Sequence, residues 1–575
     1  FPCFDEPGFK APFAVVLRTP PGLRAISNGA EVSVTREAGL DVHRFARTLP
    51  LPSYLVALMA GPFTGISGEV PPSPQRDTPL PLRIMASRAD PVQLAHALEG
   101  SQEIVTRLEE WFDTPFPFPK LDQIATPILP GAMENAGADL YQDGLLLVSR
   151  ESPVAARRRF GMIVAHELAH QWFGDLVTPV WWTDLWLNES FANWMGYRIG
   201  HAWEPELNIA PGALAEGFAA MATDALTVGR PVRQPIVRDS QIDGAFDSIT
   251  YGKGSHVIAM FAAFIGEDRF RAGVRGYMAA HRHGNASSED FFRALADAAG
   301  DPAIVPAMRS FIDQQGVPLL TFRRQGKDYV VTQSRYAPLG AAPPPVPVPV
   351  PVLGPELWSV PMCVRRAVTR LCHLLDTPRA RIILPGKDRL VPNAGGTGYY
   401  RFELDDADWD RLIRSARSLP TGEALALADS LEASFLAGRS SVRQLADLAR
   451  ELAQHRDSQV GARAFDAMSG LAVAGLIEPA AQHAYQRFVR KLYLPALEDL
   501  GLDPRRAAYL REKPETTERR AQAVRRLANS ARDGRVITVL ANAAKTYLAG
   551  DEAALDPAWY DLALPIHVLQ GGPPA

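Results

Sequence analysis

The chain has 575 residues, 47% of them hydrophobic and 22% charged, with 60 basic against 64 acidic side chains. This length and apolar content indicate roughly three or four domains with substantial cores, and the net charge of −4 argues against a protein that binds nucleic acid through a basic surface. No apolar run reaches the roughly 18 residues of a membrane span, and the three cysteines, Cys3, Cys363 and Cys372, are too few and too scattered for a disulfide framework or a cysteine-based zinc site.

The N-terminal part, residues 1–65, is predicted to be β-structure, because its apolar runs are separated by Pro and Gly. Three strands are predicted there, at 14–20, 42–49 and 54–63. A loop is predicted at 71–81, where PPSPQRDTPLP combines five prolines with polar residues.

From about Pro91 the pattern becomes helical. Residues 92–112 repeat apolar side chains at three- and four-residue spacing, which predicts an amphipathic helix. Helical patterning then continues, interrupted by loops, to about Phe311.

A second β-rich stretch follows, with strands predicted at 317–324, 329–333 and 399–404. It is interrupted by the proline-rich segment 342–355, which is predicted to be an extended polyproline connection because alternating prolines cannot donate ladder hydrogen bonds. A stiff loop between two strands explains this segment better than a ligand for an adaptor domain. After Asp405 the pattern predicts helices to the end, for example at 519–534.

The segment IVAHELAHQWFGDLVTPVWWTDLWLNESFANW, residues 163–194, predicts a metal site. On a helix, His166 and His170 lie about one turn apart and project from the same face. Glu189 follows His170 after eighteen intervening residues, on the next predicted helix. Two histidines and one glutamate leave a fourth position open for water, which is typical of a catalytic zinc site. Glu167 is close enough to reach that water without being a ligand.

The alternative is that these are ordinary helix residues, with the glutamates in solvent and the histidines in the core. The flanking sequences GMIVA and QWF are strongly apolar, so the helix is predicted to be buried. Buried His and Glu side chains without partners would be energetically costly, which favours the metal site.

A second element, GAMEN, precedes this helix and comprises Gly131, Ala132, Met133, Glu134 and Asn135. A loop of this kind can run alongside an extended peptide and hydrogen-bond to it as an added strand, while Glu134 offers a carboxylate to a cation. These five residues alone do not exclude a simple turn with an exposed glutamate.

Together, GAMEN, HELAH and the later NE pair resemble the aminopeptidase N family of zinc metallopeptidases, the gluzincin aminopeptidases. Further segments resemble the family in the same order, at 1–13, 118–127, 247–260 and 399–406. The resemblance implies a multi-domain α+β fold. Its parts are the end of an N-terminal β-domain (1–65), a thermolysin-like zinc catalytic domain (66–316), a small β-sandwich (317–405) and a C-terminal α-helical domain (406–575).

The resemblance also implies roles for individual residues and one zinc ion per chain. His166, His170 and Glu189 match the zinc ligands, and Glu167 matches the general base that deprotonates the zinc-bound water. Tyr251 matches the phenol that stabilises the oxyanion. Among the GAMEN residues, Glu134 matches the carboxylate that binds the free α-amine of a peptide substrate, and Gly131, Ala132 and Met133 match the lining of the first side-chain pocket.

The sequence departs from the family pattern in three places. Ala136 stands where the family usually has a bulky aromatic residue after GAMEN, and Gly252 stands where members commonly carry Glu. The segment that precedes PCFDEP in the family lies before Phe1, and the chain opens without an initiator Met, so a signal peptide is neither seen nor excluded. Because the helical domain also stops short of typical family members, both ends are expected to be truncated. The compartment stays open between cytoplasmic and periplasmic or secreted.

The resemblance predicts an aminopeptidase acting on peptides with a free N-terminus, with neither nucleic acid nor a membrane span involved. Three alternatives stay open: a related epoxide hydrolase, a catalytically inactive scaffold of the same family, and an endopeptidase. Asp175 and Asp184 are candidates to accept the other N–H of a zinc-bound imidazole, although helix capping explains an Asp near a helix start equally well.

Overall fold

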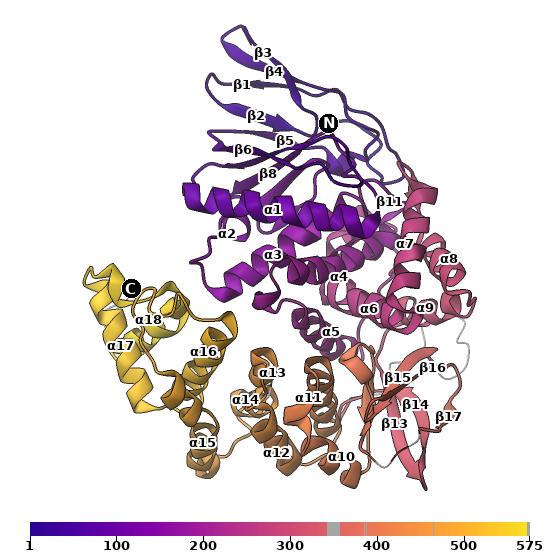
Figure 1. Cartoon of the computed structure of the whole chain (residues 1–575), viewed down its shortest axis with the longest axis vertical. Coiled ribbons are helices and arrows are strands. Elements are labelled where there is room, and N and C mark those ends of the chain that lie inside the picture. The colour runs from indigo at the N-terminus through magenta and orange to yellow at the C-terminus, as the bar shows by residue number, and fades with distance from the viewer. Residues whose placement is uncertain (342–356, 385, 387, 464, 572–575) are drawn as a thin grey trace.

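The computed structural model describes residues 1–341, 357–384, 386, 388–463 and 465–571, so the predicted polyproline segment lies outside the described residues. The chain passes from N-terminal strands at the top of Figure 1 through a helix-rich centre to a β-sandwich and a group of C-terminal helices at the bottom. The multi-domain α+β fold is therefore confirmed. The exact domain boundaries stay predictions.

The N-terminal strands form two small antiparallel sheets, one of three strands and one of two. Two predicted strands are shorter than expected: that at 42–49 ends at Phe45, and that at 54–63 begins with a 3₁₀ turn at Ser53–Leu55 that follows Pro52. The strands are β1 (Val16–Thr19), β2 (Arg24–Ser27), β3 (Glu31–Glu37), β4 (Leu40–Phe45) and β5 (Leu58–Gly61).

A five-stranded mixed sheet opens the central region, in the order β6-β7-β8-β10-β9. The strong helical bias predicted beyond Pro91 is wrong here, because three of these strands follow the first helix. All six residues of Leu121–Thr126 are buried, so the strand lacks the alternation by which a half-exposed strand is recognised. The strands are β6 (Thr64–Val70), β7 (Leu80–Ala86), β8 (Leu121–Thr126), β9 (Ala132–Met133) and β10 (Ala138–Gln142).

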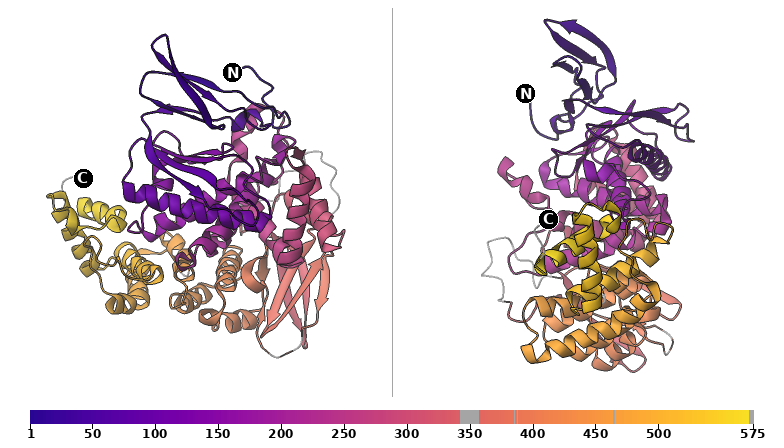
Figure 2. Two further views of the ribbon diagram at one scale, coloured as in Figure 1. Left: turned by 45° about the horizontal axis from the view of Figure 1, so that its top comes forward. Right: turned by 90° about the vertical axis from the view of Figure 1, so that its left-hand side faces the viewer.

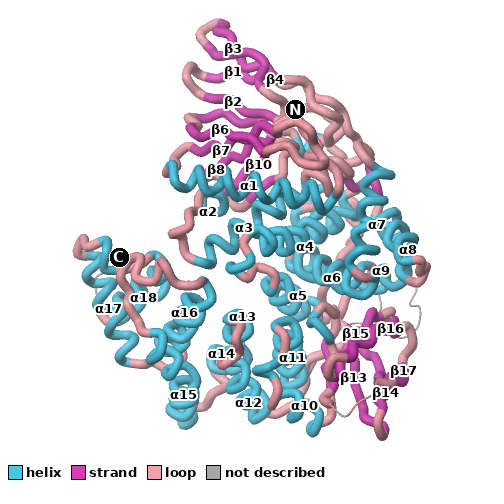
Figure 3. The backbone as a smooth tube through the Cα atoms, viewed as in Figure 1, coloured by secondary structure: helices cyan, strands magenta, loops and turns pink. Residues whose placement is uncertain are grey.

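The predicted helix at 92–112 is confirmed as α1 (Pro91–Phe112), which packs on β6 and β7. Its start follows from local chemistry: Asp90 accepts a hydrogen bond from the Val92 amide, and Pro91 occupies the first helical position. Helices fill the rest of the central region (Figure 3). They are α2 (Asp143–Leu146), α3 (Val154–His170), α4 (Leu185–Trp203), α5 (Pro211–Asp224), α6 (Gly254–Ile265), α7 (Glu267–His281), α8 (Ser288–Ala299) and α9 (Ile304–Ile312), with the short parallel pair β11 (Thr178–Pro179) and β12 (Asn285–Ala286).

The β-sandwich contains a four-stranded sheet, β17-β14-β13-β19, and a three-stranded sheet, β16-β15-β18. The predicted strands at 317–324, 329–333 and 399–404 are found as β13, β14 and β19, whereas the hairpin of β15 and β16 was not predicted. The strands are β13 (Pro318–Gln325), β14 (Asp328–Arg335), β15 (Val360–Arg366), β16 (Thr369–Leu375), β17 (Arg379–Ile382), β18 (Leu390–Val391) and β19 (Arg401–Glu403).

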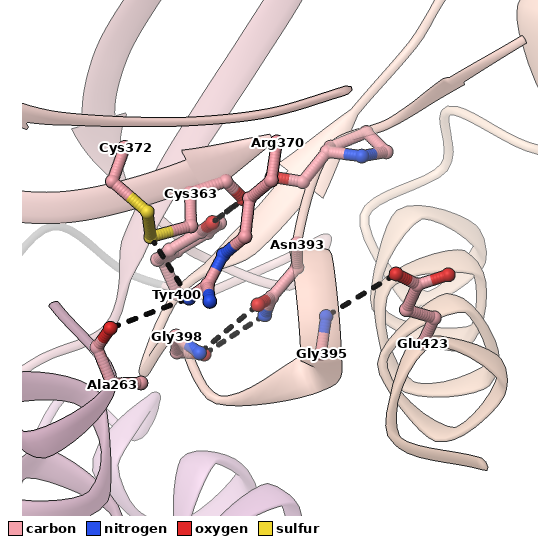
Figure 4. Close-up of a disulfide and its surroundings, with 10 residues drawn as sticks. Ala263, Cys363, Arg370, Cys372, Asn393, Gly395, Gly398, Tyr400 and Glu423 are labelled. Carbon is pink, nitrogen blue, oxygen red and sulfur yellow. Dashed lines mark hydrogen bonds between the residues drawn. A yellow bond between two sulfur atoms is a disulfide. The ribbon is translucent and has the colours of Figure 1, made fainter. Parts of the chain in front are cut away.

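Cys363 and Cys372 form a disulfide across this hairpin (Figure 4). The sequence argued against a framework of several disulfides but did not predict this single bridge. The two cysteines are nine residues apart in the sequence. The β15–β16 hairpin places them directly opposite each other, with Cα atoms 4.1 Å apart.

The C-terminal helices pack against the central region as well as against one another. Arg158 on α3 pairs with Glu518 at 3.2 Å, and Asn208 donates to Asp457 at 3.0 Å. In both views of Figure 2 these helices lie below the N-terminal strands. They are α10 (Asp406–Ile413), α11 (Thr421–Leu436), α12 (Val442–Leu452), α13 (Ser458–Arg463), α14 (Asp466–Val473), α15 (Gln482–Leu500), α16 (Pro514–Asn529), α17 (Gly534–Leu548) and α18 (Tyr560–Leu569).

Near the C-terminus one predicted helix is shorter than expected. The helix predicted at 519–534 ends at Asn529, and Asp533 caps the next helix by accepting from two amides of its first turn. Within the described part of the chain, no helix combines the length and apolarity that crossing a membrane requires.

Candidate metal centre

Two closely packed helices carry the predicted metal ligands. His166, Glu167 and His170 lie in the last turns of α3, and Glu189 lies in the second turn of α4. Two glycines on α4 allow the close approach: a Cβ atom at Gly196 would lie 2.7 Å from Met162 O, and one at Gly200 would lie 2.7 Å from Gly161 O. Because glycine has no side chain at these two positions, α3 and α4 can pack at the distance that brings the ligands together.

The structure brings His166, His170 and Glu189 together as a buried cluster whose ligand atoms all lie within 4.8 Å of one another. The two Nε2 atoms are 3.1 Å apart. The Glu189 Oε2 atom is 3.5 Å from His166 Nε2 and 3.6 Å from His170 Nε2. Two imidazoles and a carboxylate converging on one point could hold a divalent metal ion.

The tautomer of His170 fits a metal ligand. Its Nδ1 lies 3.2 Å from the carbonyl oxygen of Phe173, which can only accept. In the neutral ring Nδ1 therefore carries the proton, and Nε2 presents its lone pair to the cluster. The donor set therefore suits a cation.

Neither Asp175 nor Asp184 makes the predicted contact with a ligand imidazole. Asp184 instead binds Ser288 and Arg233, at 3.1 Å from the latter, and both carboxylate oxygens of Asp175 are buried without a hydrogen-bond partner among the described residues. The backbone carbonyl of Phe173 takes the place expected for an aspartate.

Two further acidic side chains lie at the cluster, both less than one-tenth exposed. Burial raises the pKa of Glu167 well above its usual range, and the nearby Glu134 carboxylate adds to the rise. Burial also raises the pKa of Glu134. The nearby His170 lowers this pKa, and the Glu189 carboxylate raises it. Carboxylates with raised pKa values in a cleft are candidates for proton transfer or for binding a cation.

Two of the five GAMEN residues form a short edge strand within the predicted loop. Ala132 and Met133 make up β9, which pairs with β10 on one side only among the described residues. Gly131 begins the segment with a φ of +149°, a value that favours glycine. Glu134 and Asn135 follow directly after β9 and are buried. The free edge of β9 leaves backbone groups available for an added strand.

Gln171 holds this segment against α3, and sequence reasoning did not single it out. Its side chain donates to Glu134 O at 3.0 Å and to Asp139 at 2.8 Å, and it accepts from the Gly137 amide at 2.8 Å. A fully buried Gln immediately after HELAH, in an apolar run, was the available signal, because a buried amide needs partners.

Tyr251 lies in a π-helical turn, Ile249–Lys253, that leads into α6. Its ring centroid is 6.1 Å from that of His166. Burial and the nearby Glu189 carboxylate both raise the pKa of Tyr251, so its hydroxyl stays protonated. Two side chains of α4 hold the turn: Ser190 donates to Thr250 O at 2.7 Å and Asn193 donates to Tyr251 O at 3.2 Å.

The glycine at position 252 has a structural reason. A Cβ atom there would lie 2.8 Å from Ala220 Cβ and 3.0 Å from Glu216 O, so α5 leaves no room for the glutamate that the resemblance leads one to expect.

Tyr54 is a second residue that the sequence did not indicate. It comes from the N-terminal β-structure, and its ring lies 5.3 Å from that of Trp182. Burial raises its pKa well above the usual range, and so do the carboxylates of Glu134, Asp175 and Glu189. The phenol therefore lies close to the acidic groups of the centre, through a contact between distant segments that no local pattern reveals.

Comparison with protein families and curated proteins identifies three matching regions. A peptidase family M1 domain matches residues 96–314, a peptidase M1 N-terminal domain matches residues 1–55, and an ERAP1-like C-terminal domain matches residues 390–573.

Individual relatives agree with these matches. Aminopeptidase M1-B of Oryza sativa subsp. japonica is 30% identical over 88% of this chain and 58% of its own length. Human endoplasmic reticulum aminopeptidase 1 is 32% identical over 72% of this chain and 46% of its own length, and leucyl aminopeptidase of Saccharolobus solfataricus is 32% identical over 71% and 50%. The chain thus spans about half the length of the curated relatives it matches.

Proposed function

Because the chain belongs to peptidase family M1, we propose that it is a zinc-dependent aminopeptidase that removes the N-terminal residue from peptides. The observation that carries the proposal is the convergence of a two-histidine, one-glutamate cluster with a buried carboxylate beside a free strand edge. The cluster could hold zinc, the buried carboxylate suits the free amine of a peptide, and the strand edge suits the backbone of the peptide.

Zinc held by His166, His170 and Glu189 would polarise the scissile carbonyl and lower the pKa of a water molecule to about 7. The buried Glu167 carboxylate accepts the proton of the attacking water on an Oε atom and returns it to the leaving amine. The Tyr251 hydroxyl donates to the carbonyl oxygen as negative charge develops there. The raised pKa of Tyr251 supports this role, because a phenolate could not donate.

Substrate orientation is assigned to the GAMEN segment. The backbone of Ala132 and Met133 pairs with the peptide along the free edge of β9, and Gly131 and Asn135 flank it. Glu134 binds the α-ammonium group, which at neutral pH is mostly a cation because its pKa is about 8. With the amine fixed, the first peptide bond is the one that lies at the metal cluster.

We expect metal analysis of the unchelated protein to give one zinc ion per chain. His170→Ala should lose the ion, because two ligands remain, whereas His283→Ala is the control since that histidine is exposed and outside the cluster. Plasma emission spectroscopy on dialysed protein measures the ratio. A wild-type ratio near zero, or equal zinc in both variants, would contradict the assignment.

N-acetylated peptides are expected to resist cleavage, while their free counterparts lose residues one at a time from the N-terminus. Acetylation removes the charge that Glu134 binds, and Glu134→Ala should lower kcat/KM for free peptides by about 10- to 100-fold, the size of a charge-assisted hydrogen bond. Mass spectrometry of the products measures both, with bound zinc as the control. Efficient cleavage of an acetylated peptide at an internal bond would favour an endopeptidase instead.

A further inference from the structure

Lys253 and Asp224 form a completely buried ion pair next to the centre, and the proposed reaction does not use it. Both side chains are 0% exposed, and Lys253 Nζ lies 2.9 Å from Asp224 Oδ2. Lys253 also donates to Gln314 O at 2.9 Å. A buried ion pair adds little net stability compared with an apolar pair, so its presence calls for another role, such as fixing one conformation.

The pair joins the central region to the β-sandwich. Asp224 is the last residue of α5 and accepts from the Gly316 amide at 2.8 Å. It also accepts from the hydroxyl of Tyr399, at 3.2 Å, just before β19. Burial and the Asp224 carboxylate raise the pKa of Tyr399, which keeps this hydroxyl a donor. The Lys253 ammonium lies 5.7 Å from the centre of the Tyr399 ring.

Lys253 is the last residue of the π-helical turn that carries Tyr251. From the α4 side the turn is held by Ser190 and Asn193. From the α5 side it is held by Lys253 through Asp224, the last residue of that helix, and single π-helical turns occur frequently at functional sites. The direction of the Tyr251 side chain therefore depends on contacts from both sides of the turn.

We propose that Lys253, Asp224 and Tyr399 are positioning residues that fix the Tyr251 phenol at the metal centre, so that the β-sandwich controls turnover without touching the substrate. This inference rests on the proposed function, in which Tyr251 donates to the developing oxyanion. Because a misplacement of about 1 Å at a reacting group can cost up to about 100-fold in rate, loosening the turn lowers kcat even though the chemical groups all remain.

Tyr399→Phe tests the proposal, because it removes only the hydroxyl that binds Asp224. The neighbouring Tyr400→Phe is the matched control: Tyr400 is equally buried, and the partners of its hydroxyl are the backbone oxygens of Pro392, at 2.9 Å, and Cys363, at 3.4 Å. Figure 4 shows Tyr400 beside the Cys363–Cys372 disulfide. We expect Tyr399→Phe to lower kcat by about 10-fold with KM unchanged, and Tyr400→Phe to leave both unchanged. Equal effects of the two variants would overturn the proposal.

A double-mutant cycle identifies the route of the effect. If the network acts through Tyr251, Tyr399→Phe has no further effect on kcat once Tyr251→Phe is present, because the donor it positions is gone. Full additivity of the two variants would contradict the proposal. Asp224→Asn is the second variant, because it keeps the shape of the side chain and removes its charge. It should likewise lower kcat and leave KM unchanged.

Hydrogen exchange separates this inference from the proposed function, since it needs no turnover. Amides in residues 247–255 should exchange faster in Tyr399→Phe than in the wild type, and at the wild-type rate in Tyr400→Phe. A wild-type chain without aminopeptidase activity would refute the proposed function. Unchanged exchange in both Tyr399→Phe and Asp224→Asn would refute the network, whether or not the chain is active.

Discussion

Glu167→Gln should lower kcat by about 100- to 10,000-fold, the range expected when a general base is removed, while zinc stays bound. The amide has nearly the shape of the carboxylate but cannot take a proton from the attacking water. Glu167 is not among the converging ligand atoms, so the metal content should not change.

Steady-state kinetics on a free peptide, together with metal analysis of the same preparation, measures this effect. A thermal unfolding midpoint close to that of the wild type is the control for folding. Near wild-type turnover by Glu167→Gln with zinc bound would show that another group accepts the proton.

Tyr251→Phe should lower kcat by about 100- to 1,000-fold, the size of one oxyanion donor, with KM little changed. The phenol is expected to bind the carbonyl oxygen more strongly as negative charge develops than in the ground state, which is the signature of a contribution to kcat. Tyr277→Phe is a matched control, because Tyr277 on α7 is a buried tyrosine of the same region that lies outside the centre.

The kinetic split decides the role of Tyr251. A large rise in KM at unchanged kcat would make Tyr251 a residue that binds the substrate in its ground state. An unchanged rate in Tyr251→Phe would remove it from the mechanism.

The metal cluster could be predicted from the sequence because its information is local. His166 and His170 share one helix, so helical periodicity places them on one face, and Glu189 lies on the next helix, whose distance from the first depends on the packing of α3 against α4. The α1 helix was predicted for the same reason, since its apolar spacing and its Asp90 and Pro91 start signal lie within the segment itself.

What the sequence could not predict depends on contacts between distant segments. Gln171 holds the GAMEN segment through partners more than thirty residues away, and Tyr54 reaches the acidic groups from the N-terminal β-structure. The strand Leu121–Thr126 was missed because both of its faces are buried. The pairing of Cys363 with Cys372 depends on the register of a hairpin, which composition does not contain.

The shortness of β9 has a consequence for the behaviour of the protein in concentrated solution. An exposed strand edge can promote self-association, because its unpaired backbone groups can bind a second molecule of the protein as well as a ligand. β9 consists of only two residues, Ala132 and Met133, and is followed by the buried Glu134 and Asn135. An edge of this length can engage the end of one short chain, yet it is too short to seed the continuous intermolecular sheet of an aggregate. The protein thus has an open strand edge at the metal centre without the tendency to aggregate that long open edges cause.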